Sequence, residues 1–92
     1  MDFLELVNKV GRLVKKHSQE YQVLPSREVP IKDYGYDSLD TLMLTIYIGE
    51  AYGLPKEINE KLFPTTVLEL ETSIMLHKTK EPASIQEVLD LV

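Results

Sequence analysis

The sequence predicts an all-α fold, a small antiparallel bundle of four helices plus one extra short helix. Three segments repeat apolar residues every three to four positions, which places those residues on one face of a helix. No segment alternates apolar and polar residues in the way that predicts a half-buried strand. The 92 residues fit one small domain, so we expect a single domain over 1–92.

The first helix is predicted over residues 2–18. Its apolar stripe consists of Phe3, Leu6, Val7, Val10, Leu13 and Val14. Three basic residues, Lys15, Lys16 and His17, come at its end, where positive charge complements the helix dipole. Residues 19–37 contain two prolines and no sustained helical period, which predicts a long ordered loop.

The second helix is predicted over 38–52, because Gly53 and Pro55 follow it as terminating residues. A surface helix needs only one apolar stripe, but this segment has two. The stripe expected to pack the bundle consists of Leu44, Tyr47, Ile48, Ala51 and Tyr52. The other stripe, on the side of Ser38, consists of Leu39, Leu42, Met43 and Ile46. We expect this second stripe to remain accessible to a partner.

The C-terminal part of the chain is predicted to add helices at 56–63, 66–77 and 84–92. Two Ser/Thr-x-x-Glu capping boxes, 18 residues apart, start the last two helices at Thr66 and Ser84. Pro82 lies between them and favours two separate helices over one long helix. The first of the two is expected to pack onto the bundle through Val67, Leu70 and Ile74.

The net charge of −5 is concentrated in the middle of the chain. Residues 33–76 carry eight Asp/Glu against two Lys/Arg, whereas residues 1–32 carry four against six. An acidic surface repels phosphate backbones and suits a basic protein partner, so nucleic-acid binding is not expected. An equally weighted interpretation is that the acids only keep a small domain in solution.

The composition also bears on compartment and chemistry. No apolar run approaches the roughly 18–20 residues that span a bilayer, and the start of the chain lacks the pattern of a secretory signal. We therefore expect no membrane span and a cytoplasmic location. The absence of cysteine excludes a disulfide framework, a thiolate metal site and a cysteine nucleophile.

Ser38 is predicted to start the second helix, where two roles compete. A serine at a helix start most often caps the helix, by accepting a hydrogen bond from a backbone N–H. The free N–H groups and partial positive charge of a helix start also favour an attached phosphate. In that role, Asp37 and Asp40 lie near enough to help hold a divalent ion while the group is installed. Physical considerations alone favour the cap.

The segment GYDSLDTLML, residues 35–44, resembles the signature of acyl carrier proteins. The matching positions are Gly35, Asp37, Ser38, Leu39, Asp40, Leu42 and Leu44, with Glu50 and Tyr52 where acidic and aromatic residues are usual. The order of elements is also similar: a long first helix, a long loop, the signature helix and then short helices. The resemblance covers essentially the whole chain, implies a bundle of the acyl-carrier type, and favours attachment over capping.

The resemblance implies that Ser38 carries 4′-phosphopantetheine, transferred from coenzyme A by a separate Mg²⁺-dependent transferase. The arm would hold acyl intermediates as thioesters and deliver them to enzymes of fatty acid, polyketide or specialised lipid biosynthesis. It implies a monomeric carrier with no catalytic residue, no resident metal site and no enzyme activity of its own. The residues assigned to the arm site are Ser38, Asp37 and Leu39.

Two further sets of residues follow from the resemblance. Basic docking patches on the transferase and on acyl-processing enzymes are expected to contact Asp37, Leu39, Asp40, Leu42, Met43, Ile46 and Glu50. An acyl chain is expected to lie in a pocket formed by Leu44, Tyr47, Ile58, Leu62, Phe63 and Val67. The segment 64–83 is expected either to line this pocket or only to fill the core, and the two explanations are equally good.

Some features depart from the family pattern. The signature helix of a housekeeping acyl carrier protein is usually densely acidic, but Met43, Gly49 and Ala51 occupy positions where Glu is common. Tyr36 precedes the signature Asp, where a small residue is usual. The last helix of the family matches twice, with TTVLELETSI in gapless register and ASIQEVLDLV later in the chain. These departures predict a specialised member with an insertion before the last helix.

The main alternative function is an unmodified helical interaction module that binds a partner's groove through the second stripe of the 38–52 helix. An aminoacyl or peptidyl carrier is a variant of the carrier hypothesis, and the Asp before Ser38 favours the acyl type. A DNA-binding helix-turn-helix is disfavoured because its recognition helix would be acidic.

Overall fold

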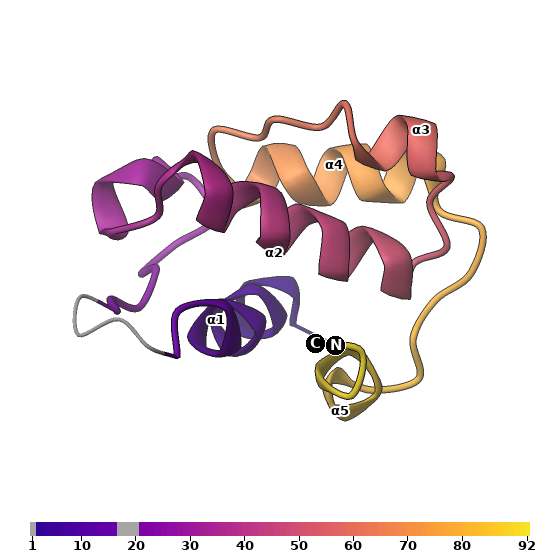
Figure 1. The fold of residues 1–92 in the computed structure, drawn as a ribbon, viewed down its shortest axis with the longest axis horizontal. Coiled ribbons are helices and arrows are strands. Elements are labelled where there is room, and N and C mark those ends of the chain that lie inside the picture. The colour runs from indigo at the N-terminus through magenta and orange to yellow at the C-terminus, as the bar shows by residue number, and fades with distance from the viewer. Residues whose placement is uncertain (1, 17–20) are drawn as a thin grey trace.

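A computed structural model describes residues 2–16 and 21–92, and these two ranges contain no β-strand. The elements are α1 (Phe3–Val14), the 3-10 helix η1 (Ile31–Tyr34), α2 (Ser38–Ala51), α3 (Lys56–Asn59), α4 (Val67–His77) and α5 (Ile85–Leu89). The all-α class predicted from the apolar periodicity is therefore confirmed. α2 runs through the middle of the molecule, between α1 below it and α3 and α4 above it in Figure 1.

α1 begins as predicted but ends earlier than the sequence suggests. The Asp2 carboxylate caps it by accepting hydrogen bonds from the N–H groups of Leu4 and Glu5, at 2.9 and 3.3 Å. The helix ends at Val14, and Lys15 leaves helical geometry as its C-cap. The predicted end at residue 18 lies outside the described residues, but the turn at Lys15 already shows that the helix prediction is too long.

The loop before α2 is held against α1 by one asparagine. The Asn8 amide donates to the Leu24 carbonyl at 3.0 Å and accepts from the Leu24 N–H at 2.8 Å. These two bonds satisfy the loop backbone where Leu24 turns into the core, with 1% of its surface exposed. Further on, the Ile31 N–H donates to the Thr65 carbonyl at 2.9 Å, which ties η1 to the start of α4. The predicted loop is thus present at residues 21–30 and 35–37, but the 3-10 helix η1 at Ile31–Tyr34 was not predicted.

The core lies between α1, α2 and α4. Apolar side chains with no exposed surface come from all three helices and from α5: Leu6, Val7, Val10, Leu44, Ile48, Val67, Leu70, Ile74 and Val88. The stripe of α2 that was predicted to pack the bundle does so, although Tyr47 is only partly buried. Burial of each such side chain stabilises the fold by about 1.5–3 kcal/mol.

The capping boxes predict the starts of α4 and α5 correctly. Thr66 accepts a hydrogen bond from the Glu69 N–H at 3.1 Å, and Ser84 accepts one from the Glu87 N–H at 3.2 Å. The two helices are separate, as predicted. α5 ends at Leu89, because the last three residues form a turn instead of continuing the helix to 92 as predicted.

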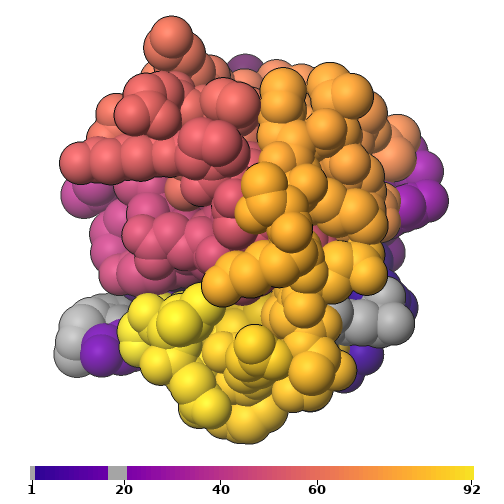
Figure 2. All heavy atoms as spheres, turned by 90° about the vertical axis from the view of Figure 1, so that its right-hand side faces the viewer, coloured from indigo at the N-terminus to yellow at the C-terminus, as the bar shows by residue number. Residues whose placement is uncertain are grey.

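α4 packs onto the bundle as predicted. α4 buries its predicted stripe, Val67, Leu70 and Ile74, completely. α5 contacts α1 and α2 and buries Val88. The chain between the two helices is fixed to the end of α2, because the Thr79 and Lys80 N–H groups both donate to the Tyr52 carbonyl. Figure 2 shows this chain passing from α4 (orange) to α5 (yellow) over one face of the molecule.

α3 is shorter than predicted, four residues instead of eight. It is docked by Asn59, whose amide donates to the Ile46 carbonyl at 3.2 Å. Gly49 makes room for this contact, because a Cβ at position 49 would lie 2.1 Å from Asn59 Oδ1. After α3 the chain passes alongside the start of α2 through Leu62 and Phe63. Pro64 follows, and a proline cannot continue a helix. No helix of the described ranges is both long enough and apolar enough to cross a membrane.

Candidate functional site

The start of α2 is capped by Asp37 and not by Ser38. Asp37 Oδ1 accepts a hydrogen bond from the Asp40 N–H at 2.8 Å, and Asp40 Oδ2 accepts one from the Asp37 N–H at 3.2 Å. The two bonds form a reciprocal capping box with an aspartate at each position. Ser38 is the first residue inside the helix, so the capping role that the pattern favoured for it is wrong.

Ser38 is exposed, and no hydrogen bond within the described residues engages its hydroxyl. The backbone N–H groups of Ser38 and Leu39 also lack partners in that part of the chain, as expected for the first turn of a helix. Donors of this kind bind phosphate and other anions readily. The fold thus leaves a free hydroxyl beside free donors.

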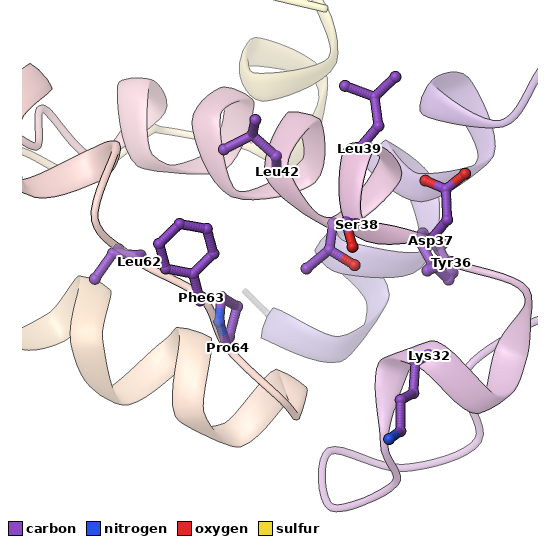
Figure 3. A pocket seen from close by; sticks show the side chains of 10 residues that line it. Lys32, Tyr36, Asp37, Ser38, Leu39, Leu42, Leu62, Phe63 and Pro64 are labelled. Carbon is purple, nitrogen blue, oxygen red and sulfur yellow. The ribbon is translucent and has the colours of Figure 1, made fainter.

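A cleft of about 400 Å³ opens beside Ser38. Its lining comprises Lys32, Tyr36, Asp37, Ser38, Leu39, Thr41, Leu42, Leu62, Phe63 and Pro64. Figure 3 shows Ser38 and Leu42 of α2 on one side of the cleft and Phe63 on the other, with Lys32 on η1 near the Ser38 end. Phe63 is 77% exposed and Leu39 62% exposed, so large apolar side chains flank the opening. The cleft can therefore accept a long group that is anionic at Ser38 and less polar beyond it.

The six residues predicted for an acyl-chain pocket do not line one common cavity among those found in the described residues. Leu62 and Phe63 line the cleft beside Ser38. Leu44 and Val67 are fully buried in the core, and Ile58 packs against the core from its edge. Tyr47 lines a separate hollow of about 280 Å³, together with Leu13, Val14, Lys16, Met43 and Val92. Of the six residues, only Leu62 and Phe63 thus line the cleft beside Ser38.

The residues predicted for partner docking lie along the accessible side of α2, with one exception. Leu42, Met43 and Ile46 are partly exposed, and Asp37, Leu39 and Glu50 are exposed. Asp40 is turned inward instead, and only 20% of its side chain is exposed. Its carboxylate is already engaged by Lys15 and by the Asp37 N–H. The second apolar stripe is thus available to a partner, whereas Asp40 is occupied.

Lys15 lies under the start of α2 as a buried cation. Its ammonium donates to Asp40 Oδ2 at 2.8 Å and to the Gly35 carbonyl, and it lies 5.5 Å from the centre of the Tyr36 ring. Partial burial opposes ionisation of Asp40, but the hydrogen bonds from Lys15 and from the Asp37 N–H outweigh it and lower the pKa of this carboxyl. Asp40 therefore stays ionised at neutral pH.

Tyr36 is a large residue at a position where the resemblance predicts a small one, and the structure shows how it is accommodated. Its ring is buried against α1, where Gly11 offers no side chain: a Cβ at position 11 would lie 1.9 Å from Tyr36 Oη. Burial raises the pKa of the phenol well above its ordinary value, so the hydroxyl stays protonated. That hydroxyl has no hydrogen-bond partner among the described residues. A large residue is tolerated before Asp37 because α1 carries a glycine opposite it.

The sequence did not lead us to expect Lys15 and Gly11 as parts of this region. Lys15 was interpreted as a residue that complements the helix dipole, since nothing in the sequence shows where a lysine beyond a helix end will turn. Gly11 carried a usable signal, because an isolated glycine within a helical pattern usually has a packing reason. Paired with the oversized Tyr36, it could have predicted the contact between α1 and the segment before α2.

No family model, curated protein or solved structure matched this chain. Within residues 2–16 and 21–92, no group of three or more His, Cys, Asp or Glu side chains is arranged to hold a metal ion.

Proposed function

We propose that the protein is an acyl carrier protein, with Ser38 as the attachment site of 4′-phosphopantetheine. The observation that carries this proposal is that the fold leaves the Ser38 hydroxyl unused. Asp37 caps α2 in its place, and Ser38 stays exposed beside a cleft of about 400 Å³. The segment GYDSLDTLML supports the identity of the group, because it resembles the signature around the modified serine of that family.

The residues around Ser38 fit the arm. The unpartnered N–H groups at the start of α2 are suited to the negative charge of a phosphodiester, and Lys32 adds a positive charge to the cleft. Leu42 and Phe63 provide apolar walls for the remainder of the arm. When bound, the arm supplies a terminal thiol that carries an acyl group as a thioester. This fits a chain without cysteine of its own.

Installation of the arm requires an accessible serine oxygen. In the transfer, the Ser38 oxygen bonds to the β-phosphorus of coenzyme A, the pyrophosphate bond breaks, and adenosine 3′,5′-bisphosphate leaves with those electrons. The transferase provides the Mg²⁺ and accepts the serine proton. Of the two aspartates expected to assist the ion, Asp37 is exposed, whereas Asp40 is held by Lys15. The proposal therefore assigns that contact to Asp37 alone.

The accessible stripe of α2 is the proposed docking surface for the transferase and acyl-processing enzymes, which we place with the carrier in the cytoplasm. Met43 and Ile46 would supply the apolar centre, and Asp37 and Glu50 would face basic residues of the partner. Exposed charge pairs are individually weak, so the apolar contacts should dominate affinity. The cargo is an acyl group from fatty acid, polyketide or specialised lipid synthesis.

The exposure of Leu39 and Phe63 also favours a second candidate, an interaction module that needs no modification. This candidate predicts binding to a partner protein by the unmodified chain. The carrier proposal predicts instead that function requires a covalent change at Ser38.

A matched pair of serine variants tests the proposal. Ser38 and Ser84 both lie at a helix start, but only Ser84 is a cap. After incubation with coenzyme A, Mg²⁺ and a broad-specificity transferase, intact mass should show one added phosphopantetheine on the native chain and on Ser84→Ala, and none on Ser38→Ala. Ser84→Ala should lose about 1 kcal/mol of stability as a lost cap, and Ser38→Ala less. An unmodified native chain, or a modified Ser38→Ala variant, would refute the assignment.

A further inference from the structure

Lys15 is the one charged residue buried in the described part of the chain, with 8% of its surface exposed. Removing an ammonium from water is costly unless hydrogen bonds and an opposite charge compensate it. Here both compensating groups come from one short segment. The Gly35 carbonyl lies at its beginning and the Asp40 carboxylate at its end, with Ser38 between them.

Two contacts hold this segment to the end of α1: the Tyr36 ring, which packs on Gly11, and the hydrogen bonds of Lys15 to Gly35 and Asp40. Gly35 has a positive φ of 84°, which ends η1 and turns the chain toward α2. Asp40 closes the capping box on Asp37 with the same oxygen, Oδ2, that binds Lys15. A single ammonium at the end of α1 thus binds both the turn that enters α2 and the cap that shapes its first turn.

We propose that Lys15 is a positioning residue for modification of Ser38: by binding the Gly35 carbonyl and Asp40, it holds the Gly35–Asp40 segment in the conformation that the transferase recognises. This inference rests on the function proposed above. Lys15 does not contact the reacting oxygen, and its effect passes through Asp40 and the capping box. It also removes Asp40 from partner docking, so that role falls to Asp37 and Glu50.

Two substitutions separate positioning from stability. Lys15→Met removes the tether but leaves Asp40 partly buried without its cation, so a loss of folding would obscure the effect. The double variant Lys15→Met, Asp40→Asn removes both charges, and an amide at position 40 can still accept from the Asp37 N–H. Lys15→Arg keeps a cation at this position, with N–H donors for the Gly35 carbonyl and Asp40. Lys9→Met is the matched control, since Lys9 makes only an exposed ion pair with Glu5 at 3.1 Å.

The measurement is the rate of phosphopantetheine transfer from coenzyme A against carrier concentration, at a temperature where each variant is folded. If only a fraction of the carrier molecules holds the recognised conformation, KM for the carrier rises by the inverse of that fraction while kcat is unchanged. We expect about a tenfold rise in KM for the double variant, the scale of losing one charged hydrogen bond, with Lys15→Arg near native and Lys9→Met unchanged. A folded double variant with native KM would overturn the inference.

Amide hydrogen exchange provides a readout that does not need the transferase. The Asp37 and Thr41 N–H groups are both bonded within the cap of α2. In the double variant their protection should fall while protection of Val10 in α1 is kept. Equal loss at all three positions would reduce Lys15 to a general stabilising residue and overturn the inference. If the native chain accepts no arm, the proposed function fails, and this exchange pattern still decides whether Lys15 holds the segment.

Discussion

Gly11→Ala is a substitution for which the structure reverses the usual expectation. Alanine in place of glycine inside a helix normally stabilises it by about 0.5–1 kcal/mol. At position 11, however, the new Cβ would lie 1.9 Å from Tyr36 Oη and 3.0 Å from Tyr36 Cζ. Overpacking of a buried site costs about 1–3 kcal/mol. The difference between these two terms ranges from about 0 to about 2.5 kcal/mol. Because the overlap with Tyr36 Oη is severe, the variant should be less stable than the native chain by about 1–2 kcal/mol.

Tyr36→Phe isolates the contact responsible. It removes the Oη atom that overlaps most, and it removes a buried hydroxyl without a partner in the described residues. By itself it should be neutral or slightly stabilising, because no hydrogen bond is lost. In the Tyr36→Phe background the ring atom nearest to the alanine Cβ is Cζ, at 3.0 Å, a smaller overlap that the ring can relieve by a small shift.

The assay is urea unfolding of the four proteins in this cycle, followed by far-UV circular dichroism. Gly11→Ala should destabilise the native background and be close to neutral with Tyr36→Phe, which gives a coupling free energy of about 1–2 kcal/mol. Equal effects of Gly11→Ala in the two backgrounds would show that Tyr36 does not pack on Gly11. The description of the segment before Ser38 would then be wrong.

Two further predictions concern Asp40 and Met43. The pKa of Asp40 lies below its ordinary value of 3.8 in the folded chain, so its contribution to stability is present above that pH and is lost as the pH falls through the folded pKa. Asp40→Asn should thus flatten the fall in stability below about pH 4, measured by urea unfolding at several pH values; an unchanged acid limb would contradict this. Met43→Glu should alter stability by less than about 1 kcal/mol, since Met43 is partly exposed, yet change the KM of the transferase for the carrier. Unchanged KM values for the transferase and an acyl-processing enzyme would remove Met43 from the docking surface.

Much of the fold could be predicted because helix faces repeat with a simple period. The packed stripes of α1, α2 and α4 and the caps at Thr66 and Ser84 all follow from local spacing. Helix ends were less predictable, since they depend on tertiary contacts. The predicted 56–63 helix stops at Asn59, where a side chain docks on the backbone of α2 instead of continuing the turn pattern.

The candidate site could be predicted in outline only. The position of Ser38 at the start of α2 follows from the signature segment, but its freedom from capping does not. Both Asp37 and Ser38 are good caps by type, and the reciprocal bond to Asp40 decides between them. The contacts of Lys15 could not be predicted for a different reason: its partners lie 20 and 25 residues away in the chain. Such contacts appear only when α1 and α2 are packed together.

The chemical state of Ser38 in the cell tests the central claim most directly. The protein should be purified from its own cells, digested, and the peptide that contains Ser38 examined by fragmentation mass spectrometry. The account predicts that this peptide carries phosphopantetheine on Ser38, with or without an acyl group, and that the peptide containing Ser84 is unmodified. A Ser38 peptide that is entirely unmodified, from cells in which other carrier domains bear the arm, would contradict the account.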